Sequence, residues 1–317
     1  MLGGNLVPIS VFDAHCDTIS RCWREYEGLE RNSGMISLER TAGFGRYCQF
    51  FALWTADGYT GGPLGGDSVE RAYQALLRCF KDQMARNADR IVQCRTAAEA
   101  ELAQSQGKAA AFLSVEGGEL LGCDPDRLAQ AAADGVKAIN LTWNHANALS
   151  GAHADGSERG LSPLGRRFVE RMEELDILVD VSHLSEAGFW DVMAMARRPI
   201  LASHSNIKSV WDHTRNLTDG QITAIIENQG VIGLNFYTEF VGGGRDLDMV
   251  RVHLDRLLEL GGERSAALGG DWDGCDTIAD LPAIDSLPRL YEHLLHHGYR
   301  ETVVQDLFYN NLMRVVR

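Results

Sequence analysis

The chain has 317 residues, of which 45% are hydrophobic and 23% are charged. This composition is typical of a globular protein and excludes collagen-like, coiled-coil and intrinsically disordered classes. With 30 basic and 44 acidic residues the formal net charge is -14, and no segment gathers Lys and Arg with aromatic residues, so nucleic acid is not expected as a partner.

Short apolar runs, each followed by a polar or Gly-rich break and then by a helical stretch, recur along the chain. The runs lack a clean alternation of apolar and polar residues, which is typical of parallel strands buried on both faces. In chain order the predicted strands span residues 9–17, 47–54, 109–118, 135–143, 176–183, 199–206, 230–237 and 265–274.

Helix-start signals lie between these runs. Ser162 followed by Pro163 predicts a helix over residues 164–175, and Ser185 and Thr218 predict the caps of the next two helices. Strands that alternate with helices predict an α/β fold, a (β/α)8 TIM-type barrel that forms one domain over residues 1–317 and ends in two C-terminal helices. A doubly wound sheet is the alternative, but the Gly-rich runs at 61–66 and 242–244, expected in loops, do not fit a dinucleotide-binding fingerprint.

The seven cysteines are scattered without a C-x-x-C pair. An odd number in this pattern argues against a disulfide framework and favours a reducing, cytoplasmic compartment. The N-terminal segment lacks a basic region, and Asp13 interrupts its apolar run, so no signal peptide is expected. No apolar run reaches about 18 residues, so a membrane is not an expected partner.

Ionisable residues gather at the C-terminal ends of the predicted strands, which is where the active site of a barrel lies. Such a clustering favours an enzyme over a purely structural protein. The residues concerned are His15 and Asp17 after the first strand, Glu116 after the third, His183 after the fifth, His204 after the sixth, and Asp271 and Asp273 after the eighth.

His15 and Asp17 lie two residues apart on a strand, so both side chains face the barrel mouth and are candidates to bind one ion. The alternative interpretation is a strand-end turn with a solvated Asp. Glu116 ends a buried strand, and a carboxylate there must be paired, protonated or bound to metal. A salt bridge from Glu116 to an Arg is an equally good interpretation of that residue alone.

His183 and His204 end consecutive strands and are expected side by side, although either alone fits a structural histidine. Together with His15, Asp17 and Glu116 they form a set of three imidazoles and two carboxylates, which suits zinc or a similar divalent ion. Two metals bridged by one carboxylate would use all five residues.

Asp271 is a candidate metal ligand or proton carrier, and Asp273 is interpreted as a helix cap or salt-bridge partner. Arg215 is a candidate clamp for an anionic substrate group, and its alternative is an ordinary surface arginine. The chain contains neither a G-x-S-x-G nor an H-E-x-x-H motif, so a serine-hydrolase triad and a helix-borne zincin site have no support.

Motifs in a characteristic order carry a resemblance to a known family. They are D-x-H-x-D at 13–17, VEGG at 115–118, VSH at 181–183, SHS at 203–205, R-N at 215–216, NFY at 235–237 and GGDWDG at 269–274. This series resembles the membrane (renal-type) dipeptidases, zinc dipeptidases of the amidohydrolase-like barrel group. The resemblance extends from about residue 9 to the C-terminus.

The resemblance implies a dinuclear zinc site. In this site His15 and Asp17 bind one zinc, His183 and His204 bind the other, and Glu116 bridges both. A hydroxide shared by the two zinc ions would attack the peptide carbonyl.

The resemblance further implies roles around the substrate. Asp271 would carry the proton, and Arg215 would hold the C-terminal carboxylate of a dipeptide. The family often has a substrate-contacting His in a Leu-Thr-His sequence, but here the third residue is Trp143 and His145 follows two residues later. Either His145 makes this contact from a reshaped loop, or the contact differs.

The predicted function is therefore that of a dinuclear zinc dipeptidase. Because family members commonly accept a D-residue at the C-terminal position of the dipeptide, the same is expected here. A homodimer is the family expectation. The alternatives are a related barrel hydrolase acting on a lactone, a phosphotriester or another amide, and a non-catalytic barrel that binds a metal or a small ligand.

Overall fold

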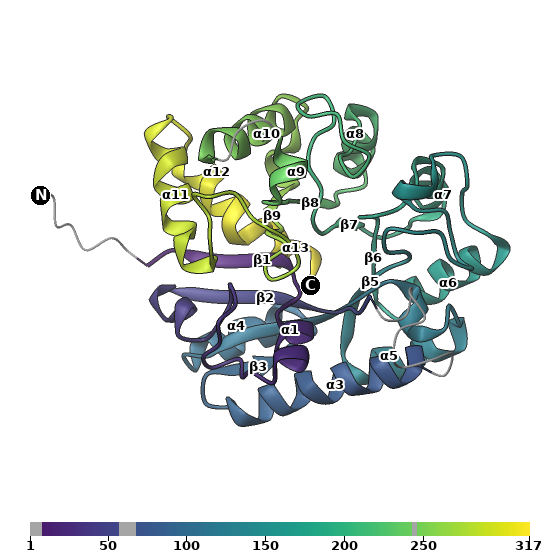
Figure 1. Cartoon of the computed structure of the whole chain (residues 1–317). Helices are drawn as coiled ribbons and strands as arrows, with labels where there is room; N and C mark the ends of the chain where they lie inside the picture. The colour runs from purple at the N-terminus through teal and green to yellow at the C-terminus, as the bar shows by residue number, and fades with distance from the viewer. Residues whose placement is uncertain (1–7, 57–67, 243–245) are drawn as a thin grey trace, which may run out of the picture.

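The computed structural model describes residues 8–56, 68–242 and 246–317 (Figure 1). The predicted strands are all present, and their neighbours pair in parallel in the order β2-β1-β9-β8-β7-β6-β5-β4. Pairing of β2 with β4 closes the barrel. These strands are β1 (Ser10–Cys16), β2 (Arg46–Leu53), β4 (Ala109–Glu116), β5 (Val136–Asn140), β6 (Leu178–Asp180), β7 (Leu201–Ala202), β8 (Val231–Leu234) and β9 (Ala266–Leu268).

One further strand was not predicted. β3 (Ile91–Gln93) pairs with the start of β4 and does not take part in the closure. Its three residues are too few to form a recognisable apolar run. The Gly-rich run at 61–66 and residues 243–244 lie outside the described part of the chain.

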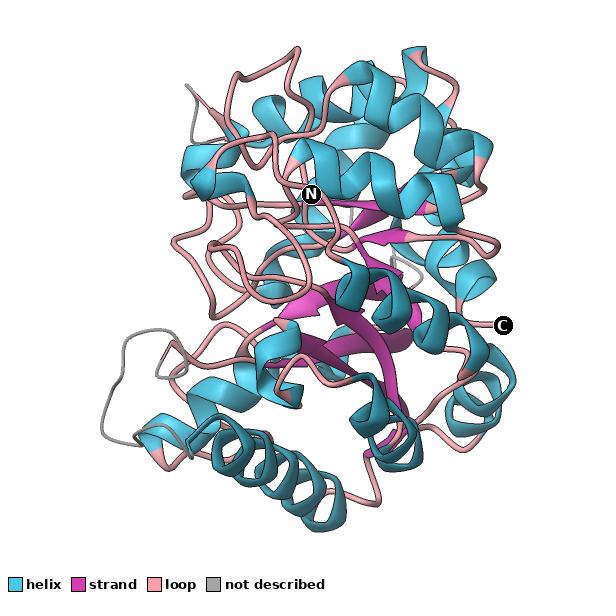
Figure 2. Cartoon of the chain, turned by 90° about the vertical axis from the view of Figure 1, so that its right-hand side faces the viewer, coloured by secondary structure: helices cyan, strands magenta, loops and turns pink. Residues whose placement is uncertain are grey.

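Helices surround the strands, and loops gather at one end of them, on the left of Figure 2. The predicted caps are confirmed, since the side chains of Ser162, Ser185 and Thr218 each accept a hydrogen bond from a backbone N–H in the first turn. The helices are α1 (Thr18–Glu25), α3 (Ser68–Arg86), α4 (Ala97–Ser105), α5 (Leu128–Asp134), α6 (Pro163–Glu174), α7 (Glu186–Met195), α8 (Asp219–Glu227), α9 (Thr238–Val241), α10 (Leu247–Glu259), α11 (Leu287–His296), α12 (Glu301–Gln305) and α13 (Asn311–Val315).

The two predicted C-terminal helical stretches are present as α11 and as a continuous segment made of α12, a π-helical turn (Asp306–Asn310) and α13. The segment packs against β1 and β9. No described helix is both long enough and apolar enough to cross a membrane.

Three phenylalanines from neighbouring strands form an aromatic layer in the core. Phe12 stacks on Phe50 and Phe112 with ring centroids 5.7 and 5.1 Å apart, and all three side chains are fully buried. Phe112 and Glu116 lie four residues apart on β4, so they share a face of the strand. The strand that carries Glu116 is therefore anchored in the core by Phe112.

Replacement of Phe112 by Ala is expected to destabilise the fold by about 3–5 kcal/mol, because it removes a buried ring and leaves a cavity between two stacked partners. Leu102→Ala is the matched control, since 61% of the Leu102 side chain is exposed and its loss should change stability by about 0.5 kcal/mol or less. Denaturant unfolding of both variants gives the comparison. An equal decrease in the free energy of unfolding in the two variants would contradict the proposed importance of the aromatic layer.

Candidate metal centre

The first part of the predicted ligand set lies where β1 and β4 end. His15 Nε2 is 3.4 Å from Asp17 Oδ2 and 3.5 Å from Glu116 Oε2. All three side chains are buried. The structure thus brings together the pair two residues apart on β1 with the carboxylate from β4.

The second part of the predicted ligand set, His183 and His204, faces the other oxygen of the Glu116 carboxylate. Glu116 Oε1 lies 2.8 Å from His183 Nε2 and 3.5 Å from His204 Nε2. The Nε2 atoms of His183 and His204 are 2.8 Å apart. Glu116 therefore directs one oxygen to His15 and the other to the His183–His204 pair, which is the arrangement of a bridging ligand.

The donor atoms fit a divalent metal such as zinc. Two donors on one tetrahedral zinc lie about 3.3–3.5 Å apart, because each bond measures about 2.0–2.2 Å. The separations of His15 from Asp17 and Glu116, and of His204 from Glu116, match this value. His15 Nε2 and Asp17 Oδ1 are buried without a hydrogen bond among the described residues, as expected of atoms suited to bind a cation.

Electrostatics also favour a cation between these groups. Burial raises the pKa of both Asp17 and Glu116, because neither carboxylate is solvated in its ionised form. Burial opposes protonation of His15, but the charges of Glu116 and Asp17 raise its pKa to about 10. Burial lowers the pKa of His183 and His204, so both imidazoles are neutral and able to donate a lone pair.

Contacts behind the ligands fix the tautomer of His183. Its Nδ1 lies 2.9 Å from Asn144 Oδ1, an atom that only accepts hydrogen bonds, so Nδ1 carries the proton and the Nε2 lone pair faces Glu116. The His204 ring is oriented by Ser203, whose hydroxyl lies 2.7 Å from Nδ1 and can donate or accept. Both imidazoles are thus oriented before any ligand is bound.

A second buried carboxylate, Asp13, ties the end of β1 to the end of β9. Asp13 accepts hydrogen bonds from the backbone of His15 and the side chain of Gln49, and from the Gly270 N–H and the Trp272 indole. Burial raises the pKa of Asp13, and these bonds oppose that rise. Asp13 thereby fixes the backbone beside His15.

Asp180 ties the end of β6 to the end of β7 in a similar way. One of its oxygens accepts hydrogen bonds from the N–H groups of Ser182 and Ser203, at 3.0 and 3.1 Å. These residues directly precede His183 and His204. Neither Asp13 nor Asp180 was predicted as a site residue, although a lone carboxylate inside an apolar strand shortly before a ligand is a readable signal.

Asp271 lies beside the first part of the ligand set. Its Oδ1 is 3.8 Å from His15 Nε2, and its Oδ2 accepts a hydrogen bond of 3.0 Å from Asn235 Nδ2. A Cβ at Gly274 would lie 2.2 Å from Asp17 Oδ2 and 2.6 Å from Asp271 Oδ1, so only glycine leaves room for these carboxylates. Asp271 thus lies within reach of an ion bound by His15 and Asp17.

Asp273 is a structural residue, as predicted. Its two oxygens accept hydrogen bonds of 2.6 Å from the Thr18 hydroxyl and from the Met35 N–H. Arg21 Nε lies 3.9 Å away. These contacts join the start of α1 to the loop after β9.

Arg215 is buried and not an ordinary surface residue, since only 3% of it is exposed. It donates to the His204 carbonyl at 3.1 Å and to the Ser205 hydroxyl at 3.5 Å. Burial lowers its pKa to about 10, so the guanidinium stays charged at neutral pH. Its Nε is buried without a hydrogen-bond partner among the described residues, and the side chain lines a cavity of about 270 Å³ that also borders His183.

The predicted substrate contact of His145 is not supported by its position. Its side chain is 60% exposed, and its Nδ1 lies 3.0 Å from Asp155 Oδ1. His145 lines neither of the two cavities that border His183. The contact with Asp155 holds it outside the centre.

His153, from the same loop, lines the cavity that borders His183 and Arg215. Its Nε2 lies 2.8 Å from Asn144 Oδ1, the atom that also binds His183, and its Nδ1 lies 2.9 Å from the Thr214 hydroxyl. Burial lowers the pKa of His153 to about 3, so the ring is neutral. In this loop only His145 was singled out as a candidate, whereas His153 contacts the residue that holds His183. His153 carries no strand-end signal, because it belongs to a long loop after β5.

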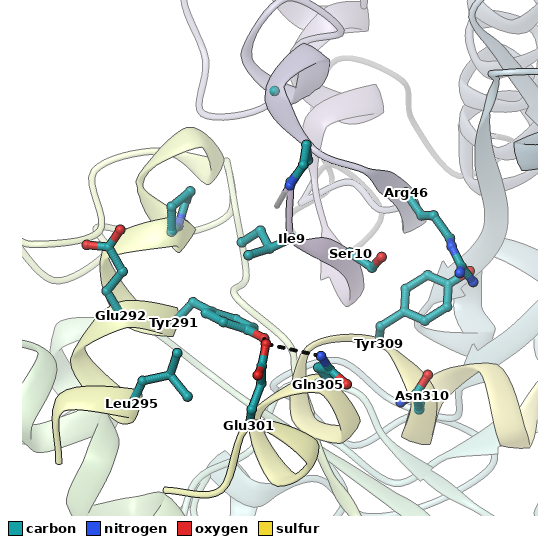
Figure 3. A pocket seen from close by; sticks show the side chains of 13 residues that line it. Ile9, Ser10, Arg46, Tyr291, Glu292, Leu295, Glu301, Gln305, Tyr309 and Asn310 are labelled. Carbon is teal, nitrogen blue, oxygen red and sulfur yellow. Dashed lines mark hydrogen bonds between the residues drawn. The ribbon is translucent and has the colours of Figure 1, made fainter. Parts of the chain in front are cut away.

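A cavity of about 630 Å³ opens over the ligand set, and Trp54 and Trp143 form part of its wall with ring centroids 5.1 Å apart. A second cavity of the same volume is lined by residues from the starts of β1 and β2 and from the C-terminal helices (Figure 3). That cavity contains none of the grouped metal-binding side chains found in the described residues. The cavity over the ligand set is therefore the candidate active site.

Sequence comparison places the chain among known relatives. The profile of the membrane dipeptidases, peptidase family M19, matches residues 6–317. An uncharacterized protein of Klebsiella pneumoniae is 34% identical over 80% of this chain and 97% of its own length. An uncharacterized dipeptidase of Schizosaccharomyces pombe is 31% identical over 64% of this chain, which spans 52% of that relative.

Solved structures agree with this placement. A metallopeptidase from Rhodobacter sphaeroides, liganded with a phosphinate mimic of the dipeptide L-Ala-D-Ala, is 29% identical with a TM-score of 0.87, covering 98% of this chain and 99% of its own. A metallopeptidase of family M19 described as dipeptidase AC is also 29% identical, with a TM-score of 0.88 and 98% of both chains covered. The chain belongs to the membrane dipeptidase family, peptidase family M19, and is a metal-dependent dipeptidase.

Proposed function

We propose that the chain hydrolyses dipeptides with two zinc ions, and that its substrates include dipeptides with a D-residue at the C-terminal position. The two-sided contact of Glu116 with His15 and with the His183–His204 pair carries the proposal of two ions. The L-Ala-D-Ala mimic bound by the Rhodobacter sphaeroides relative supports the proposed substrates.

His15 and Asp17 would hold one ion, His183 and His204 the other, and Glu116 both. Such ions supply a water of lowered pKa and polarise the carbonyl of the scissile bond. The remaining chemistry falls to side chains of this chain. Since Asp17 and Glu116 are both buried, the two ions would also offset the charge of these carboxylates.

Asp271 is the proposed proton carrier. The Asn235 amide holds one of its oxygens, and the other faces the centre beside His15. A carboxylate in this position accepts the proton of the attacking water and delivers it to the departing amine.

Arg215 is proposed to bind the C-terminal carboxylate of the dipeptide. Its charged group is buried next to a cavity that borders the ligand His183, and its Nε has no hydrogen-bond partner among the described residues. A buried guanidinium with a free donor is suited to a carboxylate. It also favours an anionic dipeptide over the neutral lactones and phosphotriesters that were the alternative substrates.

The homodimer, the cytoplasmic location and the single domain over residues 1–317 stay predictions from the sequence. The seven cysteines are all free thiols, which fits the predicted reducing compartment.

His183→Ala is expected to lower zinc content and to reduce turnover at least about 100-fold, because it removes a ligand from a shared centre. His145→Ala is the matched control and should retain metal and activity within about twofold, since its exposed side chain pairs only with Asp155. Elemental analysis and dipeptide hydrolysis measure both effects. Normal zinc content and turnover in His183→Ala would overturn the assignment of this ligand.

Arg215→Gln is expected to abolish discrimination between a free dipeptide and its C-terminal amide. A charge-assisted hydrogen bond contributes about 1.5–3 kcal/mol, so the native protein should prefer the free acid by about 10-fold to 100-fold in kcat/KM. The ratio of the two kcat/KM values is the quantity to compare, because Arg215 also supports the His204 carbonyl and its loss lowers both rates. An unchanged ratio in the variant would show that another group binds the carboxylate.

A further inference from the structure

Outside the barrel mouth, three side chains of metal-binding type meet where α10 begins and α11 ends. They are Asp248 from the first turn of α10, His293 from the last turn of α11, and His297 directly after it. We propose that this cluster binds a divalent transition-metal ion, with Zn²⁺ as the representative ion. The proposal is independent of the proposed dipeptidase function.

The separations suit a single ion. Asp248 Oδ1 lies 3.2 Å from His293 Nε2 and 3.7 Å from His297 Nε2. Donors on a tetrahedral zinc lie about 3.3–3.5 Å apart, so an ion fits with small side-chain rotations. The imidazole rings have centroids 4.2 Å apart and an angle of 45° between their planes. Both Nε2 atoms therefore converge on the carboxylate.

The local sequence explains this convergence. His293 and His297 lie four residues apart at the end of a helix, so their side chains project from the same face. The end of a helix carries a partial negative charge, which favours a cation there. α10 packs against α11 and brings Asp248 to this face.

The tautomer of His297 leaves the correct nitrogen available. Its Nδ1 lies 2.8 Å from the carbonyl oxygen of His293, which can only accept, so Nδ1 carries the proton. In the neutral ring the Nε2 lone pair then faces the Asp248 carboxylate, another electron-pair donor. Two electron-pair donors that face each other repel unless a cation lies between them. At metal sites a histidine ligand is usually held by a carbonyl or carboxylate at its second nitrogen, as His297 is here.

One neighbour competes with the ion. Arg251 Nε donates to Asp248 Oδ1 at 3.0 Å, and the Arg251 guanidinium also binds Asp255. Arg251 therefore binds the same oxygen that faces both histidines, and a bound ion would compete with its guanidinium for that oxygen. The side chains are accessible, with 55% of Asp248, 21% of His293 and 41% of His297 exposed, so water would complete the coordination.

The test measures zinc binding by the holoprotein whose barrel mouth is already loaded. After equilibrium dialysis against Zn²⁺ at pH 7.5, the native chain is expected to bind one more equivalent than the double variant His293→Ala/His297→Ala, and Asp248→Asn should bind more weakly. His296→Ala is the matched control, because this neighbouring histidine is not part of the cluster. It should retain the extra equivalent.

Circular dichroism and dipeptide hydrolysis, which should be the same in all variants, show that the fold and the barrel mouth are intact. Equal zinc content in the native chain and the double variant would overturn the proposal, and would mean that a protonated histidine alone neutralises Asp248. Loss of the extra equivalent in His296→Ala would overturn the assignment of the three ligands.

Discussion

The carboxylate of Glu116 is the interaction on which the rest of the centre depends. It ends a fully buried strand, and one oxygen faces His15 while the other faces His183 and His204. A charge in this position is costly unless a cation compensates it, and burial accordingly raises the pKa of Glu116. The strand that positions Glu116 also carries Phe112 in the aromatic layer, so core packing and the position of this carboxylate depend on the same element.

The barrel keeps its ligands in place with buried groups that are not ligands themselves. Asp13 binds backbone and side-chain donors from β1, β2 and the loop after β9, and Asp180 binds the N–H groups that precede His183 and His204. Asn144 fixes the tautomer of His183 and at the same time binds His153. A very short strand, such as β7 with its two residues, can therefore position the histidine that follows it. The hydrogen bonds to Asp180 fix the backbone after the last strand residue.

The barrel strands, and the meeting of the five expected ligands at the barrel mouth, could be predicted because each follows from a local pattern. An apolar run predicts a buried strand, and an ionisable residue at its end lies at the barrel mouth wherever the strand sits in the closed sheet. Loops offer no such rule. His145 and His153 occupy the same loop, and only the tertiary contacts with Asp155 and Asn144 decide that His145 turns outward and His153 inward. Arg215 likewise follows a strand at some distance, so its burial beneath Phe240 could not be derived from its sequence position.

The most direct test of the account locates the metal itself. Crystals of the zinc-loaded protein, measured on both sides of the zinc absorption edge, give anomalous peaks at the ion positions. The account predicts two peaks at the barrel mouth, one beside His15 and Asp17 and one beside His183 and His204, with the carboxylate of Glu116 between them. A single peak, or none at these residues in protein that contains zinc and cleaves dipeptides, would contradict the two-ion centre.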